Sequence, residues 1–578
     1  MSANTESFAL TPALVHQTIA ELTASGGPFE VGTRTVDGVE YRVYNHAPLT
    51  LLEILGIGRN HGDAVFLVQD EQRWTFTDFF AAVDALAAAL QIDYGVRPGD
   101  RVAIAMRNCS DWMLVYAAGI HVGAVVVPIN SWGSQQELCY TLIDCGAVVL
   151  AADLPRARLA SSALAEGAIP LLFSAVDGPL PAGDPLGDNP AGFAAIADVT
   201  TADQRDYRRA APGPDDTALL LYTSGSTGNP KGVIYRNLTA GQAMTNMFLT
   251  GFTSIALGEK SLGASDHPEA QLVTVPLFHA TGMFSGFILP CMLGQKVVLM
   301  RKWDAAQALR LIQNEQLTGL STVPAILKDL LTHPEFDDYD LTSIRRVAAA
   351  GAATPADLPE LLRSKLGIVS RSAGYGMTET AALGTTMTGS VFDLKPMSAG
   401  VTSPIMDIRI AETSTEEQYF EGDGEIQMRG VTVTPGYWRL DATTAEAFTD
   451  DGWIKTGDLG HFDEDGFLHI TGRIKEIIVR GGENISPIEI ENVAYRHPQV
   501  KEVAVVGIPD EAMGEELAMM CHPQPGSALT ADELRSHLAA VLPRFKVPRD
   551  IHLSTAPLPR NASEKIHRLA IRRSLTER

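Results

Sequence analysis

Residues 222–232 read YTSGSTGNPKG and directly follow the apolar run Ala218–Leu221. The glycines let this segment curl so that backbone N–H groups converge on an anion, and its hydroxyls and ammonium group can donate to phosphate oxygens. It is not a Walker A loop, because Pro230 precedes the lysine and Gly232 follows it. A flexible surface loop is the alternative for a Ser/Gly run. The preceding strand favours a phosphate site formed by Thr223, Ser224, Gly225, Ser226, Thr227, Gly228 and Lys231.

Short apolar runs alternate with helical patterns on both sides of this loop. The runs are almost continuous instead of alternating with polar residues, which indicates strands buried on both faces. Helical patterns at Phe79–Leu90 and Ala305–Glu315 lie between them. This order predicts an α/β fold with a mixed or parallel sheet. The predicted strands are Val102–Ala105, Ala147–Leu150, Ala218–Leu221, Leu272–Val275, Lys296–Leu299 and Val347–Ala350.

The composition excludes several classes of protein. The chain has 578 residues, of which 45% are hydrophobic, so it is not largely disordered. Its 69 acidic and 45 basic side chains give a formal net charge of −24. Because nucleic acids and anionic lipids attract basic surfaces, we expect no nucleic-acid partner. A local basic pocket for a phosphate ligand stays compatible with this charge.

Neither an export signal nor a membrane span is expected. The first basic residue is Arg34, so the start lacks a positively charged region, and the apolar run Met113–Ile129 is short and interrupted by His121. We interpret this run as a buried helix leading into a strand, and we expect no integral membrane segment. The cysteines form no C-x-x-C pair, which predicts reduced thiols in a cytoplasmic protein. They are Cys109, Cys139, Cys145, Cys291 and Cys521.

The pattern changes after about Thr402, where closely spaced glycines separate short strands such as Glu425–Met428 and Phe467–Ile470. This spacing predicts a compact β-rich unit with tight turns. The last hundred or so residues combine a strand at Glu502–Val506 with a helix at Ala531–Val541. We expect the Ala/Gly/Pro-rich stretch Ala175–Ala197 to be a surface loop.

Five further motifs follow the phosphate loop, and each alone has an ordinary structural explanation. Together and in this order they resemble the adenylate-forming superfamily, which includes acyl-CoA synthetases, aryl-CoA ligases, peptide-synthetase adenylation domains and firefly luciferase. The resemblance covers most of the chain and implies a large N-terminal α/β body with a small mobile α+β domain. The motifs are Pro276–Gly282 (PLFHATG), Gly374–Glu379 (GYGMTE), Thr456–Gly460 (TGDLG), Gly472–Glu476 (GRIKE) and Pro559–Ile566 (PRNASEKI).

The resemblance implies an ATP site. In such enzymes a carboxylate attacks the α-phosphorus of ATP and pyrophosphate leaves, and the protein positions the reactants and stabilises charge. The resemblance implies that the loop Thr223–Lys231 binds the β- and γ-phosphates, that Thr378 binds the α-phosphate and that Glu379 binds Mg²⁺. It also implies that Tyr375 stacks on the adenine and that Gly351 allows close approach to the base. Asp458 is implied to bind the ribose, with Arg473 nearby.

The resemblance also implies domain movement and a second half-reaction. Lys565 bridges the acyl carboxylate and the α-phosphate, and rotation about a hinge at Lys475 then allows coenzyme A to form the thioester. The implied domains are residues 1–474, with the β-rich unit at about 402–474, and residues 475–578. Glu564 stands where the family usually has glycine.

The acid predicted from the resemblance is hydrophobic. His279, at the family's acyl gate, looks like that of fatty-acid and aryl-acid members, and Met283, Phe284 and Phe287 are apolar neighbours. Other acceptors stay open, namely a carrier protein or luciferase-like oxygenation, as does a non-catalytic nucleotide sensor, for which Glu564 is the only hint. A Walker-type ATPase is disfavoured by the loop sequence. A homodimer is left open as the assembly.

Overall fold

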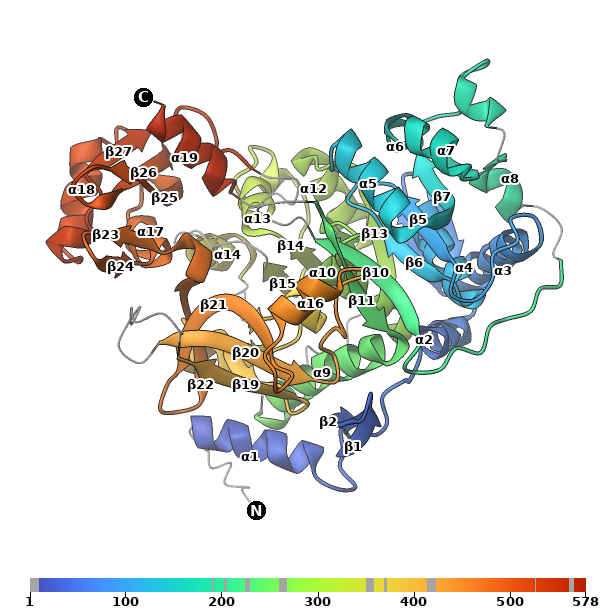
Figure 1. The fold of residues 1–578 in the computed structure, drawn as a ribbon, viewed down its shortest axis with the longest axis horizontal. Coiled ribbons are helices and arrows are strands. Elements are labelled where there is room, and N and C mark those ends of the chain that lie inside the picture. Colours follow the sequence, from blue (N-terminus) through green and yellow to red (C-terminus); the bar gives the residue numbers. More distant parts are fainter. Residues whose placement is uncertain are drawn as a thin grey trace.

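Two α/β sheets, an antiparallel β-rich sheet and a smaller mixed sheet organise the described part of the chain (Figure 1). The C-terminal elements, drawn in red, lie beside the main body, next to the orange strands of the β-rich sheet. The computed structural model describes residues 10–189, 192–201, 205–223, 229–258, 268–349, 358–367, 372–412, 423–524, 526–560 and 566–577.

The first α/β sheet contains the strand that precedes the predicted phosphate loop. Its strand order is β11-β10-β6-β5-β7-β8-β9, and β11 alone runs antiparallel to its neighbour. Because these runs are apolar without alternation, they can be covered on both faces. The strands are β5 (Arg101–Ala105), β6 (Val125–Pro128), β7 (Ala147–Asp153), β8 (Leu171–Ser174), β9 (Phe193–Ala195), β10 (Thr217–Thr223) and β11 (Lys231–Arg236).

The second α/β sheet has the order β15-β14-β12-β13-β3-β4, and its only antiparallel pair is β3–β4. An aromatic core joins it to the first sheet. There Phe287 lies 5.5 Å from Tyr116 and 6.1 Å from Phe79, measured between ring centroids. The strands are β3 (Val65–Gln69), β4 (Gln72–Thr75), β12 (Ala270–Val273), β13 (Lys296–Leu299), β14 (Gly319–Thr322) and β15 (Arg346–Ala349).

Helices surround and separate these sheets. The long ones are α3 (Phe76–Ile92), α4 (Ser110–His121), α5 (Gln135–Cys145), α9 (Asn237–Ala256) and α12 (Ala305–Glu315). The shorter ones are α2 (Leu51–Gly58), α6 (Leu154–Leu159), α7 (Ser161–Gly167), α8 (Ile196–Thr200), α10 (Ala280–Met283), α11 (Leu289–Leu293), α13 (Pro324–Leu331) and α14 (Leu358–Leu366). Two more short helices, α15 (Gly389–Leu394) and α16 (Asp441–Ala447), pack against the antiparallel β-rich sheet. No helix in the described ranges combines the length and apolar character needed to cross a bilayer.

The β-rich unit is an antiparallel sheet of order β16-β17-β18-β22-β21-β20-β19. Gly452 and Gly466 lie in turns and have positive φ, as does Gly457, which lies within a strand. The strands are β16 (Ser372–Tyr375), β17 (Thr385–Thr388), β18 (Gly400–Thr402), β19 (Met406–Ala411), β20 (Gly424–Gly430), β21 (Ile454–Phe462) and β22 (Phe467–Arg473).

The C-terminal sheet has its own apolar core, built around Ile490, Val505 and Leu534. Its strands are β23 (Ile478–Arg480), β24 (Glu483–Ile485), β25 (Val500–Asp510), β26 (Gly514–Pro523) and β27 (Asp550–Leu553), and its helices are α17 (Pro487–Tyr495), α18 (Ala531–Ala539) and α19 (Arg568–Thr576).

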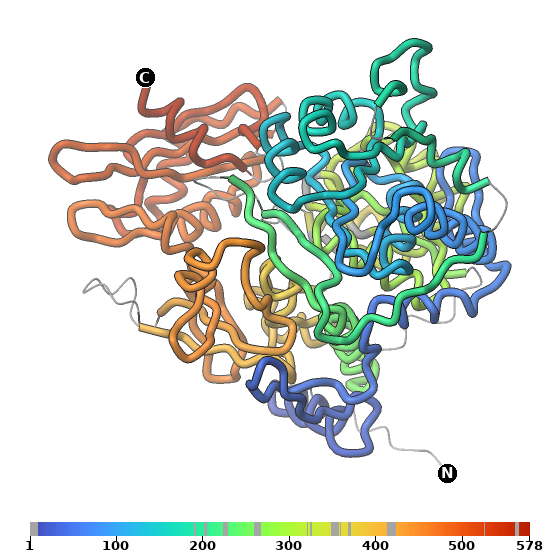
Figure 2. Tube along the Cα trace, turned by 45° about the vertical axis from the view of Figure 1, so that its right-hand side comes forward, coloured from blue at the N-terminus to red at the C-terminus, as the bar shows by residue number. Residues whose placement is uncertain are grey.

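An N-terminal helix and hairpin, for which the sequence patterns made no prediction, connect two parts of the main body. They are α1 (Pro12–Thr23), β1 (Val31–Val36) and β2 (Val39–Tyr44). Figure 2 shows them in dark blue beside the orange β-rich strands and the green α9. Tyr44 donates to Asn246 of α9 at 2.7 Å, and Arg42 contacts Asp407 of β19 at 2.6 Å. The hairpin therefore bridges α9 and the β-rich sheet.

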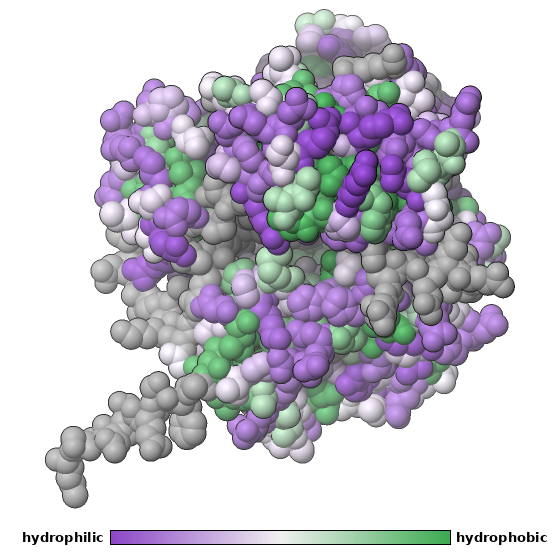
Figure 3. Space-filling model, turned by 90° about the vertical axis from the view of Figure 1, so that its left-hand side faces the viewer, coloured by the Kyte–Doolittle hydropathy of each residue, from purple (hydrophilic) through white to green (hydrophobic). Residues whose placement is uncertain are grey.

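The predicted α/β fold class is confirmed, and the predicted strands and helices coincide with observed elements, although Leu272–Val275 extends beyond β12, Ala531–Val541 extends beyond α18, and Ala350 lies outside the described residues. Lys296–Leu299 and Ala305–Glu315 match β13 and α12 residue for residue, and Met113–Ile129 spans α4 and β6. The prediction of a surface loop at Ala175–Ala197 was incomplete, since Phe193–Ala195 form the edge strand β9. The face in Figure 3 is mostly hydrophilic, with apolar side chains in separate patches, because the long apolar runs lie in the cores.

A polar cluster is buried between α2, α3 and α4. His121 is 1% exposed; one ring nitrogen, Nδ1, contacts the carbonyl of Ala117 at 2.7 Å, and the other, Nε2, contacts Arg59 at 3.0 Å. Arginine can only donate, so Nε2 accepts and His121 is neutral with its proton on Nδ1. Arg59 also pairs with Asp84. Burial lowers the pKa of His121 from 6.5 to about 4.

We expect this histidine to make the fold acid-sensitive. Its pKa is lower in the folded chain than in the unfolded one, so protons favour unfolding as the pH falls from 6.5 towards 4. At about 1.36 kcal/mol per pH unit, the loss of stability reaches roughly 2 kcal/mol by pH 5. His121→Gln keeps an acceptor for Arg59 but does not titrate. Urea unfolding of both proteins at pH 7 and pH 5 measures the difference, and equal losses in the two would contradict the assignment.

Candidate active site

The predicted phosphate loop connects the two strands of an antiparallel hairpin. Thr223 ends β10 and faces Lys231, the first residue of β11, across the ladder. The Tyr222 ring packs over Gly232, where a Cβ atom would lie 2.9 Å from it, and its hydroxyl donates to Asp144 of α5 at 2.5 Å. Ser224, Gly225, Ser226, Thr227 and Gly228 lie outside the described residues. The stem of the loop is therefore fixed by a close aromatic contact and by a hydrogen bond to α5.

Glu379 is a buried carboxylate beside this stem. It lies in the 3₁₀ turn Thr378–Thr380, is 8% exposed, and accepts a hydrogen bond from the Tyr437 hydroxyl at 2.8 Å. The backbone of Thr378 is held as well, because its carbonyl accepts from the Tyr235 hydroxyl. Burial raises the pKa of Glu379, while the hydrogen bond from Tyr437 and the charges of Lys231 and Arg473 lower it. Glu379 thus links the loop stem electrostatically to the β-rich unit.

A second buried carboxylate, Asp458, brings together three of the predicted residues. It lies on β21, is 4% exposed, and pairs across the ladder with Arg473 of β22. Tyr375, at the end of β16, donates to its Oδ2 at 2.6 Å, and the Arg473 Nε contacts its Oδ1 at 2.8 Å. Burial raises the pKa of Tyr375, so its hydroxyl stays protonated as a donor. Both oxygens of the carboxylate are held in place by these contacts.

His279 lies directly before α10, the first part of a distorted helix. α10 continues into a π-helical segment, Phe284–Ile288, and then into α11, which carries Pro290. A proline removes a backbone donor, and π-helical turns are frequent at functional sites. Met283 and Phe287 are fully buried in the aromatic core, so the structure places them away from an open pocket.

The predicted residues therefore fall into three groups. Lys231, Glu379, Asp458, Arg473 and Tyr375 are brought together by the contacts above, with Thr223 and Thr378 on the same segments. His279 lies at the start of α10. Gly351 and Lys565, like the centre of the loop, lie outside the described residues. Their roles stay predictions.

Tyr437 and Tyr235 were missed by the sequence analysis. Tyr437 is distant from Glu379 in the sequence. The one signal that could have drawn attention to it is the pair of aromatic residues, Tyr437 and Trp438, that follows Gly436. Hydroxyl partners of this kind depend on contacts across the fold, which residue spacing does not reveal.

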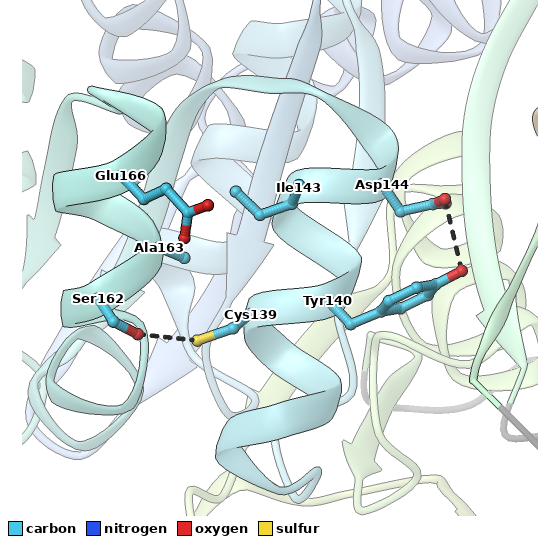
Figure 4. A pocket seen from close by; sticks show the side chains of 7 residues that line it. All are labelled: Cys139, Tyr140, Ile143, Asp144, Ser162, Ala163 and Glu166. Atoms are coloured by element: carbon cyan, nitrogen blue, oxygen red, sulfur yellow. Dashed lines mark hydrogen bonds between the residues drawn. The ribbon is translucent and has the colours of Figure 1, made fainter.

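A surface groove of about 390 Å³ lies apart from these residues, on α5 and α7 (Figure 4). Cys139 contacts the Ser162 hydroxyl there at 3.5 Å, and Tyr140 approaches Asp144 at 3.4 Å. Asp144, which accepts from Tyr222, connects the rim of the groove to the loop stem. None of the predicted site residues lines the groove.

Among the described residues, no group of three or more His, Cys, Asp or Glu side chains could hold a metal ion. A Mg²⁺ ion is commonly held by one or two carboxylates together with substrate phosphates. Glu379 fits this second arrangement, because it is a buried carboxylate whose position is held by the Tyr437 hydroxyl.

Comparison with known proteins identifies the family. Residues 57–438 match the family described as AMP-binding enzyme, and residues 489–565 match the AMP-binding enzyme C-terminal domain. A 3-[(3aS,4S,7aS)-7a-methyl-1,5-dioxo-octahydro-1H-inden-4-yl]propanoyl:CoA ligase from Rhodococcus jostii is 33% identical, over 89% of this chain and 96% of its own length. A feruloyl-CoA synthase from Amycolatopsis is 36% identical, over 86% and 93%.

A solved fatty acyl CoA synthetase from Mycobacterium tuberculosis has the same fold, with a TM-score of 0.66, 26% identity and coverage of 92% of this chain and 99% of its own. The chain therefore belongs to the AMP-binding enzyme family and is an enzyme of the AMP-forming acid–CoA ligase class.

Proposed function

We propose that this member of the AMP-binding enzyme family activates a hydrophobic, ring-bearing carboxylic acid as its acyl-adenylate and then transfers the acyl group to coenzyme A. The observation that carries the proposal is the meeting of Lys231, Glu379 and the Asp458–Arg473 pair beside the stem of the glycine-rich loop. Cationic donors and buried carboxylates at one loop suit a nucleoside triphosphate with its cation.

The proposed ATP site uses the residues assigned from the sequence. Lys231 and the loop from Thr223 to Gly228 bind the β- and γ-phosphates, Thr378 donates to the α-phosphate, and Gly351 lets the backbone approach the base. Tyr375 stacks on the adenine, and Asp458 accepts from the ribose hydroxyls. The contacts of Asp458 with Tyr375 and Arg473 support this role, since they orient both carboxylate oxygens before the nucleotide binds.

Mg²⁺ is proposed as the metal, held by Glu379 and the phosphates of ATP. When bound, it neutralises charge on the phosphates as the acid attacks. The protein's own contribution is to keep Glu379 desolvated and fixed by the Tyr437 hydroxyl.

The tail lysine Lys565 is proposed to bind the acid carboxylate and the α-phosphate together, which offsets the repulsion between two anions. Its neighbour Arg568 supports a hinge at Lys475. Arg568 contacts Glu476 at 3.1 Å and Glu491 of α17 at 2.8 Å, so the chain is tied to the C-terminal sheet from Glu476 onwards. We therefore propose that residues 1–474 and 475–578 move as separate units.

Two relatives support a ring-bearing acid, because their names describe an indane-type propanoate and a ferulate. A fatty acid is the second candidate, supported by the solved fatty acyl CoA synthetase. Coenzyme A is the acceptor in both cases.

Assembly and location are also proposals. Reduced thiols support the cytoplasm, since all five cysteines are free and four of them are buried. A homodimer is proposed as the assembly, and light scattering with the chain mass of 62.0 kDa measures it.

The acid specificity is tested by measuring pyrophosphate and AMP release with a panel of acids, with and without coenzyme A. We expect cinnamate-like and alicyclic acids to be used best, octanoate and benzoate less well, and acetate and amino acids least. Mass spectrometry should detect the thioester when coenzyme A is present. A preference for acetate or an amino acid over octanoate and benzoate would overturn the proposed acid class.

Lys565→Ala should lower acid-dependent AMP formation about 10²- to 10³-fold, since one well-placed donor to a developing charge is lost. ATP binding should persist, because the phosphate loop is intact. The matched control is Lys302→Ala, which removes an exposed lysine of the main body. Equal rates in the two variants would refute the role of Lys565, and a wild-type protein that binds ATP but forms no AMP with any acid would favour the nucleotide sensor.

Asp458→Asn should raise the KM for ATP about 10- to 100-fold, the range expected when hydrogen bonds to a charged group are lost. Asp451→Asn is the control, because Asp451 also pairs with an arginine, Arg409, on the surface of the same sheet. The measurement is acid-dependent ATP–pyrophosphate exchange against ATP concentration. The ribose assignment fails if the two variants have the same KM for ATP.

A further inference from the structure

Tyr437 contacts two charged residues of the proposed ATP site at once. Its hydroxyl donates to the Glu379 Oε1 at 2.8 Å, and the Lys231 Nζ lies 5.2 Å from the centroid of its ring. The second distance is within the range of a cation–π interaction. Tyr437 is 9% exposed and Glu379 is 8% exposed, so the hydrogen bond between them is shielded from water. One aromatic side chain therefore contacts both the loop lysine and the buried glutamate.

The backbone around Tyr437 is attached to both of these partners. Trp438 N–H donates to the Gly232 carbonyl at 2.8 Å, and Tyr437 forms a bridge with Val233 of β11. On the other side, Thr434 N–H donates to the carbonyl of Glu379 at 2.7 Å. These bonds hold the segment Thr434–Trp438 between the loop stem and the 3₁₀ turn, so the ring has a defined position relative to both.

The arrangement keeps opposite charges apart. Lys231 and Glu379, which are both described, form no direct ion pair, although the positive charge of Lys231 acts on Glu379. In a buried site, a lysine and a glutamate that are free to meet would form a close pair. Such a pair would occupy the ammonium needed for phosphate and the carboxylate needed for the cation. The tyrosine ring gives the ammonium another favourable position, and its hydroxyl fixes the carboxylate.

We propose that Tyr437 is a positioning residue that orients Glu379 towards Mg²⁺ and separates Lys231 from it so that both remain available to ATP. This inference rests on the proposed function, because it takes Glu379 and Lys231 as ligands of Mg²⁺–ATP. Tyr437 itself touches neither the substrate nor the metal in this scheme.

Two substitutions separate the hydroxyl from the ring. Tyr437→Phe removes the bond to Glu379 but keeps the ring beside Lys231, whereas Tyr437→Leu removes both. The control is Tyr44→Phe. Tyr44 is another buried tyrosine, which lies in the N-terminal hairpin and whose hydroxyl donates to Asn246 of α9. Manganese serves as the paramagnetic probe, and its binding to each protein is measured by electron paramagnetic resonance with ATP and without acid or coenzyme A.

Tyr437→Phe should raise the dissociation constant of Mn²⁺ in the presence of ATP about 10- to 100-fold, as expected when a partner of a metal ligand is lost. Tyr437→Leu should also raise the dissociation constant of ATP measured without metal, by roughly 2- to 30-fold, because Lys231 loses its cation–π contact and can pair with Glu379 instead. Tyr44→Phe should change neither constant.

The inference is overturned if Tyr437→Phe, folded with the same unfolding midpoint as Tyr44→Phe, binds Mn²⁺ as tightly as the wild type. It is also overturned if the wild type does not bind Mn²⁺ and ATP together. The binding measurement contains no acid and therefore does not depend on ligase activity. A wild-type protein that binds Mn²⁺ and ATP, but forms no AMP in the separate assay with acids, would contradict the ligase proposal and leave the role of Tyr437 in Mn²⁺ binding intact.

Discussion

Two buried carboxylates, Glu379 and Asp458, constrain the rest of the site. Removing a charge from water is costly unless hydrogen bonds and opposite charges replace the solvent. Asp458 is compensated by the Tyr375 hydroxyl and by Arg473, and Glu379 by the Tyr437 hydroxyl with Lys231 and Arg473 at longer range. Because these partners come from β11, β16, β22 and the segment after β20, the carboxylates keep their geometry only if the first α/β sheet and the β-rich sheet are correctly packed.

The sequence predicted the strands that consist of continuous apolar residues better than the strands with few apolar residues. Strands such as β13 are continuous apolar runs buried on both faces, and they were located almost to the residue. The N-terminal hairpin was not predicted, because β1 (VGTRTV) has few apolar residues and the hairpin is held by contacts with Asn246 and Asp407, which are distant in the sequence. The edge strand β9 is three residues long and has only intermediate burial, so composition gave it the character of a loop.

The candidate site was predictable where chemistry is contained in a short motif. The glycine-rich loop and the GYGMTE and TGDLG segments each combine an unusual backbone with polar side chains, and the structure brings their described residues Lys231, Glu379 and Asp458 to one region. Apolar character was a poorer guide. Phe287 looked suitable for an acyl pocket, but it contacts Tyr116 and Phe79 in the core. A hydrophobic side chain fits a pocket and a core equally well, and only the packing decides between them.

Partners of the motif residues are harder to find than the motifs, and this has a physical reason. A phosphate-binding lysine is recognisable from its loop, but whether its charge is available depends on what lies beside it. In this chain Lys231 and Glu379 act on each other electrostatically, and Tyr437 contacts both side chains. Uncharged residues such as Tyr437 therefore contribute to the electrostatics of such a site together with its charged groups. Their importance follows from the geometry of the charges they separate.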